Sequence, residues 1–170
     1  MNYIIDRVED HEYYYNLFIE NLQYASESDF VESFPKCNVK TFHYTVNNIL
    51  GKSLIDTFLN LSNLKDLITT NYGETKWFGG WLNRYGKGEF QEAHKHYQEV
   101  GDPDLVYVYF LKIPEGQHFF NFCDKDGNNK KYINEKSGDV IIFDPRLYHS
   151  VDPNTSDDYR YTIAGNIYLK

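Results

Sequence analysis

The sequence predicts a mainly β protein with N-terminal helices. Apolar residues recur at helical spacing in the first part of the chain, and from Trp77 onward the apolar pattern changes to a period of two. The aromatic content is 18%, and aromatic side chains fit the pleated surface of a sheet. Short strands separated by turn residues predict a sandwich or barrel with the helices packed outside.

Two helical regions are predicted before the strands begin. The first follows Asp10, a residue type that caps helices. Its apolar stripe contains Tyr14, Leu17, Phe18, Leu22 and Ala25. The second begins near Ser53, where Asp56 three residues later resembles a capping box, and Asn71-Tyr72-Gly73 ends it. We expect both regions to pack an apolar face against the sheet.

Short strands occupy the rest of the chain. The nearly continuous apolar run from Leu105 to Ile113 indicates a strand that is covered on both faces. Further strands are predicted at 81–85, 119–122, 140–143 and 159–169. No internal repeat, linker or low-complexity segment interrupts the 170 residues, which predicts one domain.

Charge and cysteine usage limit the possible partners and locations. The formal net charge of −8 repels phosphate backbones, so nucleic acid is an unlikely partner. No apolar run is long enough to cross a membrane, and the acidic N-terminal segment does not resemble a signal peptide. Cys37 and Cys123 are interpreted as free thiols in a reducing compartment, which predicts a cytoplasmic protein.

Three of the six histidines are candidate metal ligands. His94 and His96 are two residues apart on a predicted strand, so both imidazoles would point to the same face. His149, which follows the strand at 140–143, is the third candidate. Non-haem iron sites use facial sets of three protein ligands, although imidazole also suits zinc and copper. The alternative for His94 and His96 is an ordinary polar strand face. For His11, His43 and His118 we expect a structural or solvent-exposed role.

Arg160 is the candidate that discriminates between functions. It begins the last predicted strand, where one face carries Arg160, Thr162, Ala164 and Asn166. If that face lines a pocket, the guanidinium suits bidentate capture of a carboxylate, with the Thr162 hydroxyl as a second donor. Asn83 and Tyr85 share a face of an earlier strand and are further candidates. The alternative for Arg160 is a surface salt bridge.

Two segments resemble the metal-binding segments of the 2-oxoglutarate/Fe(II)-dependent oxygenases. WLNRYGKGEFQEAHKHY is similar to the first segment of the prolyl 4-hydroxylase-like branch, in which Tyr and Gly precede His-x-Asp. The matching residues here are Tyr85, Gly88, His94 and His96. GDVIIFDPRLYHSVDPNTSDDYRYTIAGN is similar to the second segment, in which a distal His precedes Arg-x-Ser/Thr; these positions are His149, Arg160 and Thr162. The resemblance spans 77–169 and is close to oxygenases of marine bacteria and their phages that also carry His-x-His.

The resemblance implies a double-stranded β-helix, or jelly roll, and an enzyme. It implies a single domain over 1–170, with a helical support region at 1–76 and a jelly-roll core at 77–170. Fe(II) would be the metal and 2-oxoglutarate the cosubstrate, whose oxidative decarboxylation drives hydroxylation of a substrate C–H. His94 and His149 would bind iron, and Arg160 would bind the distal carboxylate of 2-oxoglutarate, helped by Thr162 and by Tyr85 or Asn83.

The prime substrate implied by the resemblance is a peptidyl residue of the prolyl type, or an amino acid or other small molecule. Loops at 24–50, 97–104 and 124–136 would select it. The host compartment would be the cytoplasm of a cell or of a phage-infected cell.

The sequence departs from the family pattern at one ligand position. His96 occupies the place of the usual Asp or Glu. His96 itself, a water molecule, or a remote carboxylate such as Glu92 or Glu99 could complete the site, and we favour His96. Replacing a carboxylate by a neutral imidazole makes the metal site one charge more positive. The alternatives to an oxygenase are a cupin-type metal protein, a non-catalytic jelly-roll module and a zinc hydrolase.

Overall fold

Two antiparallel sheets and a layer of helices make up the structure, a computed structural model that describes residues 3–32, 42–44, 49–97 and 101–170. The larger sheet contains β1 (Tyr3–Arg7), β2 (Phe30–Glu32), β3 (Phe42–Tyr44), β4 (Thr75–Phe78), β5 (Trp81–Tyr85), β7 (Leu105–Lys112), β10 (Asp139–Phe143) and β12 (Arg160–Leu169). The smaller sheet contains β6 (Gln91–His94), β8 (Phe120–Phe122), β9 (Lys131–Tyr132) and β11 (His149–Val151).

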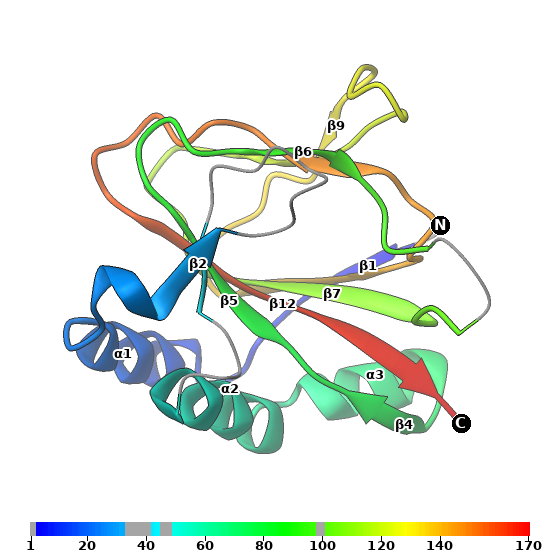
Figure 1. Ribbon diagram of the computed structural model, residues 1–170. Helices are drawn as coiled ribbons and strands as arrows, with labels where there is room; N and C mark the ends of the chain where they lie inside the picture. Colours follow the sequence, from blue (N-terminus) through cyan, green and yellow to red (C-terminus); the bar gives the residue numbers. More distant parts are fainter. Residues whose placement is uncertain (1–2, 33–41, 45–48, 98–100) are drawn as a thin grey trace.

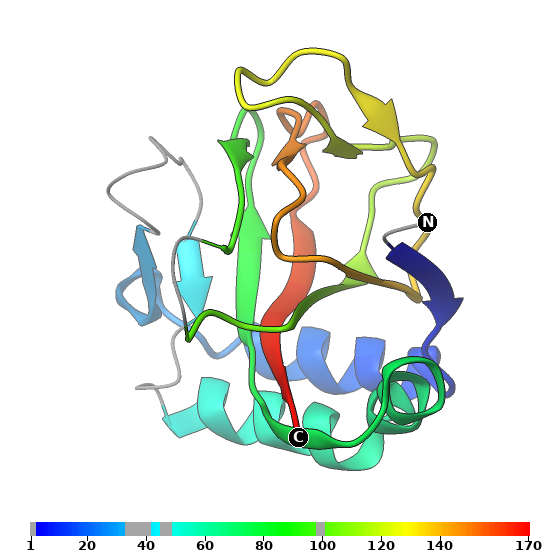
Figure 2. The same cartoon turned by 90° about the vertical axis from the view of Figure 1, so that its right-hand side faces the viewer.

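The strand order is that of a sandwich in which the chain passes back and forth between the two sheets. It is β1-β10-β7-β12-β5-β3-β2 in the larger sheet, with β4 paired to β12, and β6-β11-β8-β9 in the smaller sheet. In Figure 1 the helices lie below the larger sheet and the smaller sheet lies above it, and Figure 2 shows the same layers after a 90° turn. This arrangement confirms the predicted mainly β jelly roll with N-terminal helices.

The helices differ in detail from those that the sequence predicts. They are α1 (His11–Leu22), α2 (Ile49–Leu61) and α3 (Leu64–Tyr72), with a short 3₁₀ turn at Glu27–Asp29. Asp10 precedes α1 as expected, but it adopts a left-handed conformation (φ 55°) and its side chain makes no capping bond. The predicted start at Ser53 is wrong, because α2 already begins at Ile49 and Asp56 forms an ion pair with Lys52 one turn earlier. The single region predicted there is also wrong, because α2 ends at Leu61 and α3 begins at Leu64, but Gly73 (φ 111°) ends α3 at the predicted position.

Strand β7 separates two apolar cores, which confirms that both of its faces are covered. Its odd-numbered side chains, including Tyr107 and Tyr109, pack with the helices, and its even-numbered ones, such as Val108, pack between the two sheets. Strand β12 alternates in the same way, with Ile163 on the helix side and Ala164 between the sheets. The face shared by residues 160, 162, 164 and 166 is therefore directed toward the interior of the sandwich.

Several strands are absent from the sequence prediction. β1 pairs with β10, β3 pairs with β5, and β9 is only two residues long. Such short segments become strands because distant strands offer hydrogen-bond partners, which local periodicity does not reveal. Strands from the first part of the chain thus join the sheet of the second part, and the division at residues 76 and 77 remains a prediction.

The structure bears on two sequence features used to predict location, the absence of a membrane span and the free cysteines. Among the described residues, no helix combines the length and the apolar character that crossing a membrane requires. Cys123 is a free thiol, whereas Cys37 lies outside the described residues.

Candidate metal centre and cosubstrate pocket

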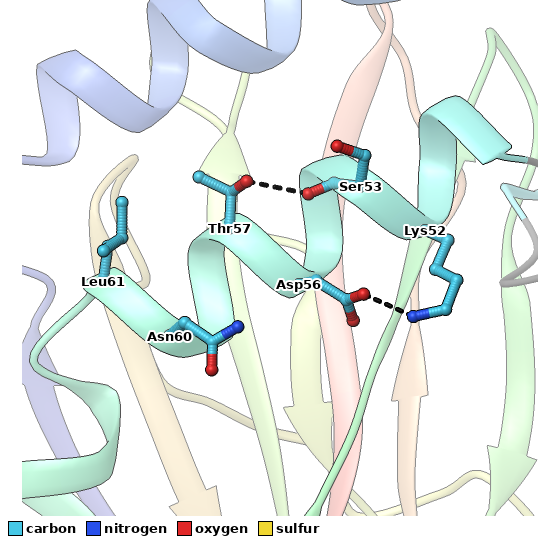
Figure 3. A pocket seen from close by; sticks show the side chains of 6 residues that line it. All are labelled: Lys52, Ser53, Asp56, Thr57, Asn60 and Leu61. Atoms are coloured by element: carbon cyan, nitrogen blue, oxygen red, sulfur yellow. Dashed lines mark hydrogen bonds and ion pairs between the residues drawn. The ribbon is translucent and has the colours of Figure 1, made fainter.

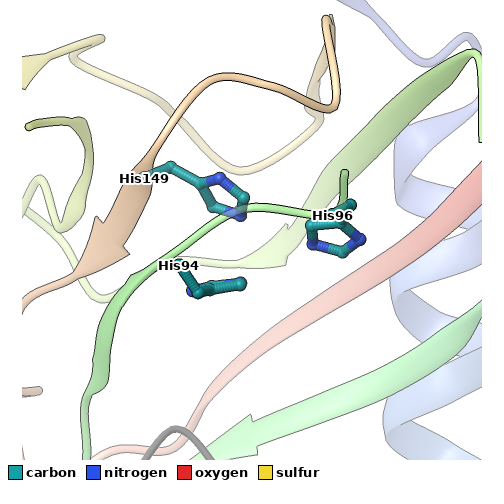
Figure 4. A group of neighbouring side chains, drawn as sticks. All are labelled: His94, His96 and His149. Carbon is teal, nitrogen blue, oxygen red and sulfur yellow. The ribbon is translucent and has the colours of Figure 1, made fainter. Parts of the chain in front are cut away.

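Three histidine side chains converge between the two sheets. His94 ends β6 and His149 begins β11, and the two residues are register partners in the smaller sheet. His96 joins them, so that one ring nitrogen of each histidine lies within 4.8 Å of those of the other two, and the ring centroids are 4.2 to 5.4 Å apart (Figure 4). The structure thus brings together all three histidines that the sequence singles out.

His96 reaches this group by a route that the sequence does not predict. The expected strand ends at His94, and His96 lies in a bend beyond it. The backbone N–H groups of His96 and Tyr97 both donate to the carbonyl oxygen of Pro145, at 3.0 and 3.1 Å. This bond to the turn before His149 directs the imidazole toward the other two rings.

Hydrogen bonds fix the tautomer and the orientation of each ring. The Nδ1 atoms of His94 and His149 lie 2.8 and 3.1 Å from the backbone oxygens of residues 92 and 147, and His96 Nδ1 lies 3.1 Å from Asn166 Oδ1. Because these oxygens only accept hydrogen bonds, each Nδ1 carries the proton. The lone pair of each histidine is therefore on Nε2, which is the atom available to a metal.

The environment keeps the three imidazoles neutral. Burial lowers the pKa of His94, and burial together with the neighbouring imidazole of His94 lowers the pKa of His96 to about 4. For His149, burial and the other two histidines lower the pKa well below its ordinary value. Neutral imidazole is the form that binds metal ions, so the group is ready to bind a metal at neutral pH.

No carboxylate completes this group in the part of the chain that the structure describes. The metal-capable cluster found there consists of the three histidines, and the side chain of Glu92 is exposed to solvent. Glu99 lies outside the described residues. The geometry therefore favours His96 over Glu92 as the third protein ligand.

Arg160 is buried between the sheets without a hydrogen-bond partner. Its side chain is 1% exposed, and Nε, Nη1 and Nη2 make no hydrogen bond within the described residues. The guanidinium carbon lies 4.6 Å from the ring centroid of Phe119 and 5.1 Å from that of Tyr85. Burial lowers the pKa of Arg160, yet a guanidinium stays charged in proteins, and an unpaired buried charge is unfavourable. The alternative of a surface salt bridge is wrong, and the site fits an anionic group that enters from outside.

The other predicted pocket residues lie beside Arg160 on the paired strands β5 and β12. Tyr85 is the register partner of Arg160, and Asn83 is that of Thr162. All of these side chains are buried, and the Asn83 amide donates to the Thr162 hydroxyl at 3.3 Å. The Tyr85 hydroxyl donates to Gln91 Oε1 at 3.2 Å, which connects this strand to β6. The predicted carboxylate-binding residues thus form one inner face of the sandwich.

The remaining histidines and the surface depressions lie apart from this group. His11 Nδ1 is 2.6 Å from the Tyr109 hydroxyl, His118 is exposed, and the side chain of His43 lies outside the description. A depression on the surface of α2 is lined by Lys52, Ser53, Asp56, Thr57, Asn60 and Leu61 (Figure 3). A second depression lies between β6, residues 125–130 and residues 150–153. The second depression is lined by Glu92 and by part of the predicted substrate loop at 124–136, but neither depression is lined by the three histidines or by Arg160.

Comparison with known proteins identifies the family. Residues 80–168, just over half of the chain, match the 2OG-Fe(II) oxygenase superfamily. The chain therefore belongs to this superfamily of enzymes. The match confirms the predicted dioxygenase class with Fe(II) and 2-oxoglutarate as its cofactors, and it decides against a cupin-type protein. No curated protein sequence matches this chain.

Solved structures show the same fold at low sequence identity. A Pseudomonas putida prolyl-4-hydroxylase is 14% identical with a TM-score of 0.68, over 99% of this chain and 93% of its own. A viral collagen prolyl hydroxylase from Paramecium Bursaria Chlorella virus-1, solved with 2-oxoglutarate, is 13% identical with a TM-score of 0.66, over 100% and 97%. HygX from Streptomyces hygroscopicus, with nickel, 2-oxoglutarate and hygromycin B, is 11% identical with a TM-score of 0.69, over 97% and 82%.

Proposed function

We propose that this chain is a 2-oxoglutarate-dependent hydroxylase whose cosubstrate is held by Arg160. The observation that carries this proposal is the buried guanidinium of Arg160, which has no hydrogen-bond partner among the described residues. Thr162 and Tyr85 or Asn83 lie next to it and supply further polar contacts. A bidentate contact from the guanidinium would select a ligand with a carboxylate at its far end, as 2-oxoglutarate has.

In this proposal His94, His96 and His149 hold Fe(II) through their Nε2 atoms. The chain supplies three neutral ligands, so the metal site keeps one more positive charge than a site with a carboxylate ligand. The acceptors at Nδ1 hold the rings in place and keep the protons away from the metal side. When bound with dioxygen, Fe(II) and 2-oxoglutarate supply the oxidising chemistry, which yields succinate, carbon dioxide and a hydroxylated substrate.

For the prime substrate we propose a peptidyl residue of the prolyl type or an amino acid. The support is structural similarity to prolyl hydroxylases, one of which, from Trichoplax adhaerens, was solved with a peptide fragment. HygX, solved with hygromycin B, supports a small-molecule substrate as the second candidate. The charge of −8 keeps nucleic acid an unlikely partner, and the cytoplasmic location stays a prediction.

Anaerobic titration tests the proposal. Fe(II) and 2-oxoglutarate added together should produce a visible charge-transfer band that neither gives alone, and admission of air should produce succinate. Absence of the band in folded protein would contradict the proposal and would favour a non-catalytic jelly roll. A mass-spectrometric screen of prolyl peptides and free amino acids for the gain of one oxygen would then identify the substrate class.

A further inference from the structure

Glu135 is a buried carboxylate that the proposed function does not yet use. It is 1% exposed, and no other acidic side chain in the described part of the chain is as fully buried. Its Oε1 accepts hydrogen bonds from the backbone N–H groups of Phe119 and Phe120, at 2.7 and 2.9 Å. Its Oε2 is buried and has no hydrogen-bond partner there. Burying a carboxylate is unfavourable unless its oxygens are hydrogen-bonded, and here only Oε1 is.

Both residues that Glu135 holds contact the proposed cofactor site. The Phe119 ring lies 4.6 Å from the guanidinium carbon of Arg160. The Phe120 ring stacks on the His149 imidazole, with centroids 5.5 Å apart and planes at 22°. One carboxylate oxygen thus anchors the backbone beneath both aromatic contacts.

The local structure explains why a side chain is needed at this point. β9 pairs only with Asn121 and Phe122 of β8, and Asn134 beyond it adopts a left-handed conformation (φ 55°) that turns the chain away. The beginning of β8 is therefore without a neighbouring strand on the β9 side. Glu135 Oε1 supplies the missing acceptor, and a charged acceptor makes a stronger bond than a neutral one.

We propose that Glu135 is a positioning residue of the cosubstrate pocket, which holds the Phe119 ring against Arg160 so that the guanidinium faces the distal carboxylate of 2-oxoglutarate. This inference rests on the proposed function of Arg160. Glu135 makes no ion pair with Arg160, because no contact within 4.0 Å joins the two described side chains. Its charge acts on Arg160 only from a longer distance, where it raises the pKa of the guanidinium against the lowering by burial, and the contact between the two residues runs through the Phe119 ring.

The test compares 2-oxoglutarate with pyruvate, a 2-oxoacid that lacks the distal carboxylate. Dissociation constants for both are measured anaerobically on the Fe(II)-loaded full chain, from the charge-transfer band. Glu135→Ala should reduce the preference for 2-oxoglutarate over pyruvate by about tenfold, since two buried N–H groups lose their acceptor. Glu135→Gln keeps an acceptor oxygen of the same reach and should retain the preference to within about threefold. A general loss of stability would weaken both ligands alike and leave their ratio unchanged.

Two further variants complete the design. Phe119→Leu leaves Glu135 in place and should reduce the same preference, so the proposal stays testable if Glu135→Ala fails to fold. Asp104→Ala is the matched control, because Asp104 Oδ2 also accepts a backbone N–H, that of Leu169, but at the far end of β12. It should leave the preference unchanged.

The outcomes separate this inference from the proposed function. If the unaltered protein binds 2-oxoglutarate more tightly than pyruvate, and Glu135→Ala or Phe119→Leu keeps that preference in full, the positioning role is overturned. It is also overturned if Glu135→Gln loses the preference as completely as Glu135→Ala. If the unaltered protein shows no preference at all, the proposed role of Arg160 fails, whatever the variants do.

Discussion

His94 and His149 face each other directly across β6 and β11, with ring centroids 4.2 Å apart. Because they are register partners in one sheet, the hydrogen bonds of the ladder fix their separation, and neither ring depends on a loop for its place. His96 is held less directly, through the bond of its backbone to Pro145 and of its ring to Asn166. The metal site therefore has two ligand positions set by the sheet and one set by a bend.

Removal of His149 should abolish tight metal binding. The ring is buried and its Nε2 faces the other two imidazoles, so His149→Ala takes away a sheet-fixed ligand. Outer-sphere changes alone typically cost 10- to 100-fold in metal affinity, so the loss of a ligand should exceed about 100-fold. Competition with a coloured chelator measures this affinity. His118→Ala is the control, because His118 is exposed and outside the histidine group; equal losses in the two variants would contradict the assignment.

Replacement of Arg160 should weaken 2-oxoglutarate binding with the metal still bound. Arg160→Ala removes a buried, charge-assisted contact that is expected to contribute about 2–5 kcal/mol. Arg160→Lys keeps the charge but loses the planar fork, so it should recover only part of the affinity. Anaerobic titration of the charge-transfer band gives the dissociation constants. If Arg160→Ala bound 2-oxoglutarate as tightly as the unaltered protein, Arg160 would have another role.

The buried charge of Arg160 should make the ligand-free protein less stable than a variant with an apolar side chain at this position. Replacing buried ionic groups by apolar side chains of similar volume is often stabilising by about 1–4 kcal/mol. Because Arg160 has no hydrogen-bond partner among the described residues, Arg160→Met should raise the free energy of unfolding. Added metal should stabilise both proteins, whereas 2-oxoglutarate added to the metal-loaded form should give further stabilisation to the unaltered protein and much less to the variant. Urea denaturation with and without the ligands checks both statements. A variant that is less stable than the parent would indicate that Arg160 has a structural partner in the native protein.

Local alternation predicted which residues of β12 and of β5 share a face, and the family resemblance placed them in one site. The period of two in β12 places Arg160 and Thr162 on the same face, and the pairing with β5 brings Tyr85 and Asn83 beside them. The inner position of that face follows from the apolar character of the opposite one, which packs with the helices. The shared faces depend on neighbouring residues and can be predicted from a single sequence, whereas the pairing of the two strands joins distant parts of the chain.

The opposite side of the pocket could not be predicted in this way. Phe119, which immediately precedes β8, contacts Arg160, and Glu135, which follows β9, binds the backbone of Phe119, so both contacts join segments that are separated in sequence. The bend that brings His96 to the metal group depends on the carbonyl of Pro145, which no periodicity reveals. The same limit applies to β1, which becomes a strand only because β10 lies beside it.

Stability of the metal-free protein should fall in mild acid. Burial lowers the pKa of His94, His96 and His149 in the folded state, for His96 from 6.5 to about 4, whereas in the unfolded chain these groups titrate near 6.5. Below pH 6.5 the unfolded chain binds more protons, so the free energy of unfolding decreases as the pH falls, by up to about 1.4 kcal/mol per pH unit for each histidine that stays neutral in the folded state. For His96 this decrease should continue to about pH 4. Above pH 6.5 these groups should contribute no pH dependence.

Chemical denaturation at several pH values, in the presence of a chelator, measures this slope. His96→Gln removes one titrating group and should make the slope shallower by up to about 1.4 kcal/mol per pH unit. If the slope in His96→Gln matched that of the unaltered protein, the folded state would not be holding His96 in its neutral form.

Restoring the carboxylate that the family pattern has at position 96 should separate the charge of the metal site from its occupancy. His96→Asp keeps a ligand side chain but makes the metal site one unit less positive. Fe(II) binding should persist. The dianion 2-oxoglutarate should bind less tightly, because the Asp carboxylate repels it. Two unit charges about 4 Å apart interact by about 1–4 kcal/mol when solvent screens them in part, and we expect a loss of this size. His96→Ala is the companion variant, because it leaves only the sheet-fixed pair, His94 and His149. If His96 is a ligand, His96→Ala should lower the affinity for Fe(II) and His96→Asp should not. If water fills the third position instead, neither variant should change this affinity.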